Sequence, residues 1–177
     1  MNNKTRRENP APRKKAAVTI RSLLTDLGSQ DGQVRVRARK SLVAIGGPAV
    51  RPLVKTLANK REWCRWEAAK TLRQIGDAGA TRALIKALDD RMFDVRWLAA
   101  EGLIAIGREA LVPLLEALIN HADSLWLREG AHHVLHDTNQ RGLAGILRPV
   151  IRALEGVEPS VEAPLAARKA IEALTWG

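Results

Sequence analysis

The sequence contains one cysteine, no tyrosine and one phenylalanine. A lone Cys64 cannot form an internal disulfide framework, and it cannot by itself supply a cysteine-rich zinc site. No apolar run approaches the roughly 20 residues that a membrane-spanning helix needs, and no hydrophobic segment follows the polar N-terminus as it would in a secretory signal. These absences predict a cytoplasmic protein with no membrane partner.

Sequence motifs of catalysis are missing as well. There is no glycine-rich phosphate loop, no nucleophile elbow and no pair of carboxylates at a fixed helical spacing. His132 with His136, and Glu129 with His133, are each four residues apart, but two ligands from one helix make a weak metal site. We therefore expect no catalytic residue, no metal site and no cofactor, and an enzyme is the less favoured interpretation.

Apolar residues make up 46% of the 177 residues, chiefly as alanine, leucine, isoleucine and valine, which suit close packing of helices. The net charge of +10 is unevenly distributed. Residues 1–76 contain eighteen Lys and Arg against five Asp and Glu, whereas residues 77–177 contain eleven against fourteen. Residues 1–17 combine basic residues with Pro10 and Pro12 and show no apolar periodicity, so we expect a disordered basic arm there.

An internal repeat determines the expected fold. The pair Ile-Gly recurs at intervals of 30 and 31 residues, with an Arg ten positions before each Ile, and with Ala three and Leu seven positions after that Arg. A fourth copy keeps the Arg, Ala and Leu but has Thr138-Asn139 in place of Ile-Gly, and a fifth keeps only the spacing. The repeated sets are Arg35, Ala38, Leu42; Arg65, Ala68, Leu72; Arg96, Ala99, Leu103; and Arg128, Ala131, Leu135. The Ile-Gly pairs are Ile45-Gly46, Ile75-Gly76 and Ile106-Gly107.

A second phased pattern of Leu, Ile and Val lies between these segments, and both patterns have the spacing of three and four that marks one apolar face of a helix. Each copy is therefore expected to be a helix pair, with Gly ending the second helix in a left-handed turn. A pair of about 30 residues cannot bury its apolar face alone, so neighbouring pairs must stack. Residues 155–164, acidic and broken by proline, are expected to project as a long loop in the last pair. We predict an all-α, right-handed α-α superhelix of about five pairs, divided at residues 18–46, 47–76, 77–107, 108–139 and 140–177.

The third copy resembles the HEAT family, and within it the short repeats of the phycobilisome (bilin) lyase type. The residues that carry this likeness are Asp90, Val95, Arg96, Ala99, Ala100, Leu103, Ile106 and Gly107. The resemblance implies that the second helix of each pair lines a concave face. Because this architecture serves many functions, the likeness specifies the fold far more strongly than the function.

The resemblance also implies a ladder of hydrogen bonds between repeats. In such a ladder an Asp or Asn before the second helix works with the Arg at its start, and here Asn59 with Arg65 and Asp90 with Arg96 keep that spacing. In the first and fourth copies the residue six positions before the Arg is Ser or Ala. The ladder is therefore expected to be incomplete at both ends, unless neighbours such as Asp31 and Asp123 substitute.

Candidate binding residues occupy positions one, five and eight after the repeated Arg, which must point away from the core because the Ala and Leu positions face it. Two tryptophans fall at matching places in consecutive copies. Exposed aromatic and Arg side chains are typical of binding hot spots. The alternative is that Trp66 and Trp97 pack between helices as spacers. The candidate partner-binding residues are Lys40, Trp66, Lys70, Arg73, Trp97, Glu101, His133 and His136.

These features favour a non-catalytic scaffold whose concave face binds another protein, as a helix or as an extended segment. The alternative is a nucleic-acid-binding protein that uses the basic N-terminal half, with Trp stacking on bases. The resemblance also allows two kinds of enzyme, a bilin lyase-like protein and an alkylpurine-glycosylase-like protein. For the latter, Glu101 is the one acid placed beside a concave Trp. The partner and the oligomeric state stay open.

Overall fold

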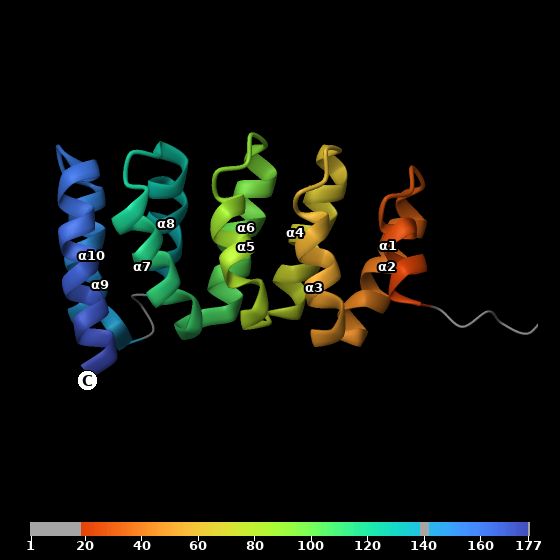
Figure 1. Cartoon of the computed structure of the whole chain (residues 1–177), viewed down its shortest axis with the longest axis horizontal. Helices are drawn as coiled ribbons and strands as arrows, with labels where there is room; N and C mark the ends of the chain where they lie inside the picture. The colour runs from red at the N-terminus through yellow and green to blue at the C-terminus, as the bar shows by residue number, and fades with distance from the viewer. Residues whose placement is uncertain (1–18, 139–141, 177) are drawn as a thin grey trace, which may run out of the picture.

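The computed structural model describes residues 19–138 and 142–176, and the expected basic arm at residues 1–17 lies outside these residues. The described residues form helices joined by short loops, with no strand among them, and the helix pairs stand side by side in one row (Figure 1). This confirms the predicted all-α solenoid. No helix in the described part is long and apolar enough to cross a membrane. The helices are α1 (Ile20–Leu27), α2 (Gly32–Ile45), α3 (Gly47–Thr56), α4 (Glu62–Ile75), α5 (Thr81–Ala87), α6 (Phe93–Ile106), α7 (Leu111–Asn120), α8 (Leu125–Thr138), α9 (Ala144–Leu154) and α10 (Pro159–Trp176).

The Ile-Gly pairs end α2, α4 and α6, as predicted. Gly46, Gly76 and Gly107 have φ angles of 68°, 66° and 79°, a region that favours glycine because it has no Cβ. The N–H of each of these glycines donates a hydrogen bond to the carbonyl of the repeated Leu four residues earlier. The chain can therefore reverse sharply after each second helix and begin the next pair.

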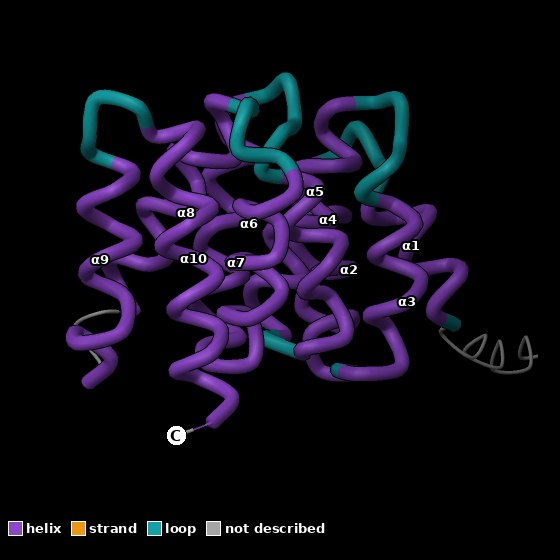
Figure 2. Tube along the Cα trace, turned by 60° about the vertical axis from the view of Figure 1, so that its left-hand side comes forward, coloured by secondary structure: helices purple, strands orange, loops and turns teal. Residues whose placement is uncertain are grey.

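The helices lie in two layers (Figure 2). The second helices α2, α4, α6 and α8 pack on one another in sequence, and the first helices α1, α3, α5 and α7 form the other layer. The repeated Ala and Leu residues point between the layers and are at most 2% exposed in all four copies. Alanine at these positions lets neighbouring second helices approach closely.

The first helices are less tightly packed than the second helices. Clefts of about 560, 570 and 630 Å³ open between α1 and α3, between α3 and α5, and between α5 and α7. The second helices show closer mutual packing along the same stretch. This difference places the second helices on the inner side of the array from α1 to α8 and the first helices on its outer side.

The last pair exchanges its layers. The helix α9 packs against α8, in the layer of the second helices, whereas α10 packs against α7 and α9, in the layer of the first helices (Figure 2). The fifth copy is therefore not a further repeat in the regular order, although Ala167 and Ala170 of α10 are buried. The exchange follows the copy that has Thr138-Asn139 in place of Ile-Gly.

The predicted long loop at residues 155–164 is wrong. The helix α10 begins at Pro159, so only residues 155–158 connect it to α9. Proline is favourable at the first position of a helix, because its missing N–H would have no intrahelical partner there. Pro159 thus starts the helix and does not prolong the loop.

Candidate functional site

The inner face, defined here as the solvent side of α2, α4, α6 and α8, carries all eight candidate binding residues. Lys40, Arg73, Trp97 and His136 are exposed, and the other four are half-buried. None of the eight is sealed in the core. The eight residues therefore share one face, but they divide into separate groups.

Four of them form one connected group, which we call the inner cluster: Arg73, Trp97, Glu101 and His133. The indole of Trp97 and the imidazole of His133 stack with ring centroids 4.6 Å apart and planes 29° apart. One carboxylate oxygen of Glu101 lies 3.1 Å from Nε2 of His133, and the other lies 3.2 Å from a guanidinium nitrogen of Arg73. Since these side chains come from α4, α6 and α8, the cluster joins three successive repeats.

Phe93 extends the inner cluster and was not among the residues predicted from the sequence. Its ring lies 6.4 Å from that of Trp97, centroid to centroid, and the residue is 64% exposed. It stands four residues before Trp97 at the start of α6, on the same side of the helix. That spacing was the sequence signal for it, although the residue precedes the repeated Arg from which the candidate positions were counted.

Trp66 differs from Trp97 although the two occupy the same position of the repeat. The side chain of Trp66 is half-buried and packs against the core, and the Nζ atom of Lys70 lies 4.2 Å from the centroid of its ring. Trp97 is 47% exposed. The lysine therefore covers the solvent-facing side of the Trp66 ring. The position equivalent to Lys70 in the next repeat is Glu101, which points to His133 and Arg73 and not to Trp97.

Lys40 and His136 lie apart from the inner cluster. Lys40 is exposed on α2. The ring of His136 stacks on that of His132, with centroids 6.1 Å apart, and Nε2 of His132 lies 2.9 Å from the carboxylate of Glu155. These contacts join α8 to the end of α9. In the described part of the chain no three His, Cys, Asp or Glu side chains gather as a metal site would need.

The repeated Arg closes the loop before its own helix. Its guanidinium donates a hydrogen bond to the backbone carbonyl six residues earlier, at 2.8 Å for Arg35, 3.0 Å for Arg65 and 2.8 Å for Arg96, and Arg128 does the same. The acceptor is a backbone oxygen, so the side chain at that position is irrelevant to the bond. The expectation of an incomplete ladder at both ends is therefore wrong for this contact. The side chain of Asn59 does not bind Arg65. It accepts a hydrogen bond from the backbone N–H of Arg61 at 2.9 Å.

The contact of the Arg with the next repeat varies along the array. Arg35 and Arg39 both bind the carboxylate of Glu67. Arg65 binds both carboxylate oxygens of Asp90, at 2.6 and 2.9 Å. The partner of Arg96 is an aromatic ring and not a carboxylate. Its guanidinium lies 4.5 Å from the centroid of the Trp126 ring. Two carboxylates and one ring thus connect four successive repeats.

The pair of Arg65 and Asp90 is nearly enclosed, since the two side chains are 9% and 10% exposed. Burial alone would raise the pKa of Asp90. Hydrogen bonds from Arg65 and from the N–H of Met92, together with the charges of Arg65 and Arg91, outweigh burial and lower that pKa below its ordinary value. The hydrogen bonds between the two side chains act in the opposite direction on the guanidinium, and they raise the pKa of Arg65. The pair is therefore ionised at neutral pH and acts as a structural clasp.

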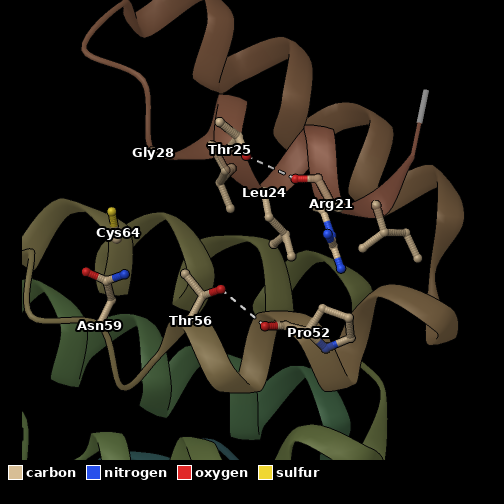
Figure 3. Close-up of a pocket in the computed structure, with 10 residues that line it drawn as sticks. Arg21, Leu24, Thr25, Gly28, Pro52, Thr56, Asn59 and Cys64 are labelled. Carbon is tan, nitrogen blue, oxygen red and sulfur yellow. Dashed lines mark hydrogen bonds between the residues drawn. The ribbon is translucent and has the colours of Figure 1, made fainter. Parts of the chain in front are cut away.

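Cys64 is buried beside the cleft between α1 and α3 (Figure 3). Burial raises the pKa of its thiol, which outweighs the lowering effect of the charge of Arg61. Little thiolate is then present at neutral pH, and access is restricted. We expect Cys64 to react with a colorimetric disulfide reagent at least about tenfold more slowly in the native protein than in denaturant. Equal rates in the two conditions would contradict the buried placement.

The family comparison agrees with this architecture. The sequence pattern of HEAT repeats matches residues 20–103 and 63–136. Among solved structures, a designed armadillo repeat protein is 21% identical over 89% of this chain and 100% of its own, with a TM-score of 0.43. An engineered protein is 22% identical over 89% of this chain and 81% of its own, with a TM-score of 0.39. No curated protein matches the chain. The HEAT pattern covers well over half of the chain, which therefore belongs to the HEAT repeat family.

Proposed function

We propose that the inner face binds another protein, holding a helix or an extended segment against Trp97 and Phe93. The observation that carries this proposal is the exposure of two adjacent aromatic rings that the inner cluster holds in place. Large aromatic surfaces and arginine dominate protein interfaces, because they bury much area at a low cost in side-chain entropy. The stacking on His133 also fixes the indole before the partner arrives, which reduces the ordering cost of association.

The charges on this face indicate the kind of segment that would fit. The basic residues Lys40 of α2 and Lys70 of α4 lie on the same face as the aromatic rings of α6, on the N-terminal side of those rings. A partner segment with one or two large apolar side chains for the rings, followed by acidic residues for the basic helices, would be complementary. We therefore expect an acidic, amphipathic segment to be selected.

Two other interpretations have less support. One face of the Trp66 ring is covered by Lys70, and His133 stacks on Trp97, so each ring has less free surface for a nucleic-acid base. Glu101, the acid that a glycosylase-like reaction would need, is already bound to Arg73 and His133. The first fact weakens the interpretation that bases stack on these tryptophans, and the second weakens the glycosylase-like interpretation.

Selection from a displayed library of random peptides tests the proposal. Peptides enriched on the wild-type protein are measured by titration calorimetry against Trp97→Ala, which we expect to bind about 30-fold or more weakly, since removal of an aromatic hot spot costs about 2 kcal/mol or more. The matched control is Trp63→Ala, because Trp63 has a similar exposure of 43% but lies beside Arg61 and outside the inner cluster. Equal loss in both variants, or none in Trp97→Ala, would refute the proposed site.

A further inference from the structure

The outer face carries a second charged surface that the proposed function does not use. We call it the basic stripe: Arg21 of α1, Arg51 and Lys55 of α3, and Arg82 and Lys86 of α5. All five side chains are exposed. The residues of this stripe stand on the first helices, on the opposite side of the molecule from the inner cluster.

The basic stripe follows the repeat. Arg21, Arg51 and Arg82 are 30 and 31 residues apart, and Lys55 and Lys86 are 31 apart, the same intervals that separate the Ile-Gly pairs. Equivalent positions stand at equivalent points on neighbouring helices, about 8–10 Å apart. Within α3 and α5 the two basic residues are four apart and therefore lie one turn above each other on one side. The result is a row of positive charge about 20 Å long.

The clefts show which way this row faces. Arg21 lines the cleft between α1 and α3 and points toward α3 (Figure 3). Lys86 lines both the cleft between α3 and α5 and that between α5 and α7, so it stands on the crest that separates them. On α3 the buried residues are Ala49, Val50 and Leu53, which leaves Arg51 and Lys55 on the solvent side. The stripe therefore follows the ridges of the outer face.

The stripe differs from four arginines of the inner layer, because its positive charges have no carboxylate partner among the described residues. Arg35, Arg39, Arg65 and Arg73 all bind carboxylates, whereas within residues 19–138 and 142–176 none of the five stripe residues has such a partner. The acids that line the cleft beside Arg82 and Lys86 are Asp89 after α5 and Glu116 of α7, and neither forms an ion pair with the stripe. Asp89 accepts a hydrogen bond from Ser124. The row ends at α7, where Val112 and Glu116 take the two positions.

The chemistry around the stripe distinguishes between possible ligands. The exposed large apolar side chains of the described residues lie elsewhere, with none on α1, α3 or α5. A protein partner would need such anchors for affinity, and a single-stranded nucleic acid would need aromatic rings for stacking. The phosphate backbone of a duplex needs only regularly placed cations, because released counterions drive its binding.

We infer that the outer face binds the phosphate backbone of a nucleic-acid duplex through the basic stripe, without reading its sequence. A row about 20 Å long would follow roughly six base pairs at 3.4 Å each. If all five cations contact phosphates, the logarithm of the binding constant should fall with a slope of about −4.5 against the logarithm of salt concentration. The affinity would then drop by roughly 500-fold between 50 and 200 mM salt.

The test is a salt titration of fluorescent 16-base-pair DNA and RNA duplexes with the full chain. The stripe variant R51Q/K55Q/R82Q/K86Q should reduce the magnitude of the slope by about 3 to 4. The matched control R37Q/K40Q/K70Q/R73Q removes the same charge from α2 and α4 on the inner face, and it should keep the wild-type slope. Both variants should keep the wild-type circular dichroism spectrum, because the stripe residues are exposed and the control changes no core side chain.

Three results would overturn the inference: no duplex binding at 50 mM salt, an equal loss of slope in both variants, or tighter binding of poly-L-glutamate or of anionic phospholipid vesicles than of either duplex. An equal loss would assign the binding to net charge or to the N-terminal segment. Peptides selected on the inner face should bind the stripe variant with unchanged affinity. Failure of the basic stripe and failure of the inner face are therefore distinguishable.

Discussion

Replacement of Asp90 by alanine is expected to lower the free energy of unfolding by about 3 to 5 kcal/mol, the cost of removing one partner from a buried ion pair. The guanidinium of Arg65 would stay nearly enclosed without its carboxylate, and the N–H of Met92 would lose its acceptor. The substitution also removes a contact between the second repeat and the third, because this pair joins α4 to the loop before α6. Urea denaturation followed by circular dichroism measures the effect.

The dependence of stability on pH is a second test of the pair of Arg65 and Asp90. The folded-state pKa of Asp90 lies below the ordinary 3.8, so its stabilising contribution is complete above that value and is lost as pH falls through the folded-state pKa. The difference in stability between wild type and Asp90→Ala should therefore shrink on acidification below about pH 4. Asp94→Ala is the control, since Asp94 is exposed in the first turn of α6 and should cost less than about 1 kcal/mol. Similar losses in the two variants would contradict the role of the clasp.

Truncation of Leu103 to alanine is expected to cost about 2 to 5 kcal/mol, because the side chain is fully buried in the third repeat and the surrounding helices can collapse only partly. In a stacked array a central residue supports the repeats on both sides of it. We therefore expect the urea transition of Leu103→Ala to move as a whole and not to leave an intact half.

The control for this truncation is Leu125→Ala, at a leucine that is 56% exposed at the start of α8. Its loss should stay within about 0.5 kcal/mol. If the two truncations lower the free energy of unfolding equally, the apolar side chains between α5 and α6 do not form the core described here.

Much of the fold could be predicted from the sequence because the repeat imposes it. The repeated Ala and Leu positions report which side of each helix is apolar, and the glycine after Ile reports where the chain must reverse. The exchanged layers of α9 and α10 could not be predicted in this way. Amphipathic spacing says that one side of a helix is covered, but it does not say which neighbour covers it. The absence of the Ile-Gly pair at Thr138-Asn139 was the sequence feature that coincides with the change.

The candidate site was harder to predict because equal positions have unequal surroundings. Trp66 and Trp97 occupy one position of the repeat, yet the residue four places later is Lys70 in one case and Glu101 in the other. The lysine lies on its own tryptophan, whereas the glutamate bridges to Arg73 and His133. The ladder shows the opposite case, since the Arg bonds a backbone carbonyl and thus tolerates any residue six positions earlier.

The most direct test of the inner cluster is the nuclear magnetic resonance signal of the His133 imidazole. A ring 4.6 Å from the indole of Trp97 should have its carbon-bound protons shifted upfield by the ring current of that indole. We predict that Trp97→Ala moves these resonances back to ordinary positions while Trp66→Ala leaves them unchanged. If His133 resonances do not respond to Trp97→Ala, the second helices do not stack as described, and the proposed binding face does not exist.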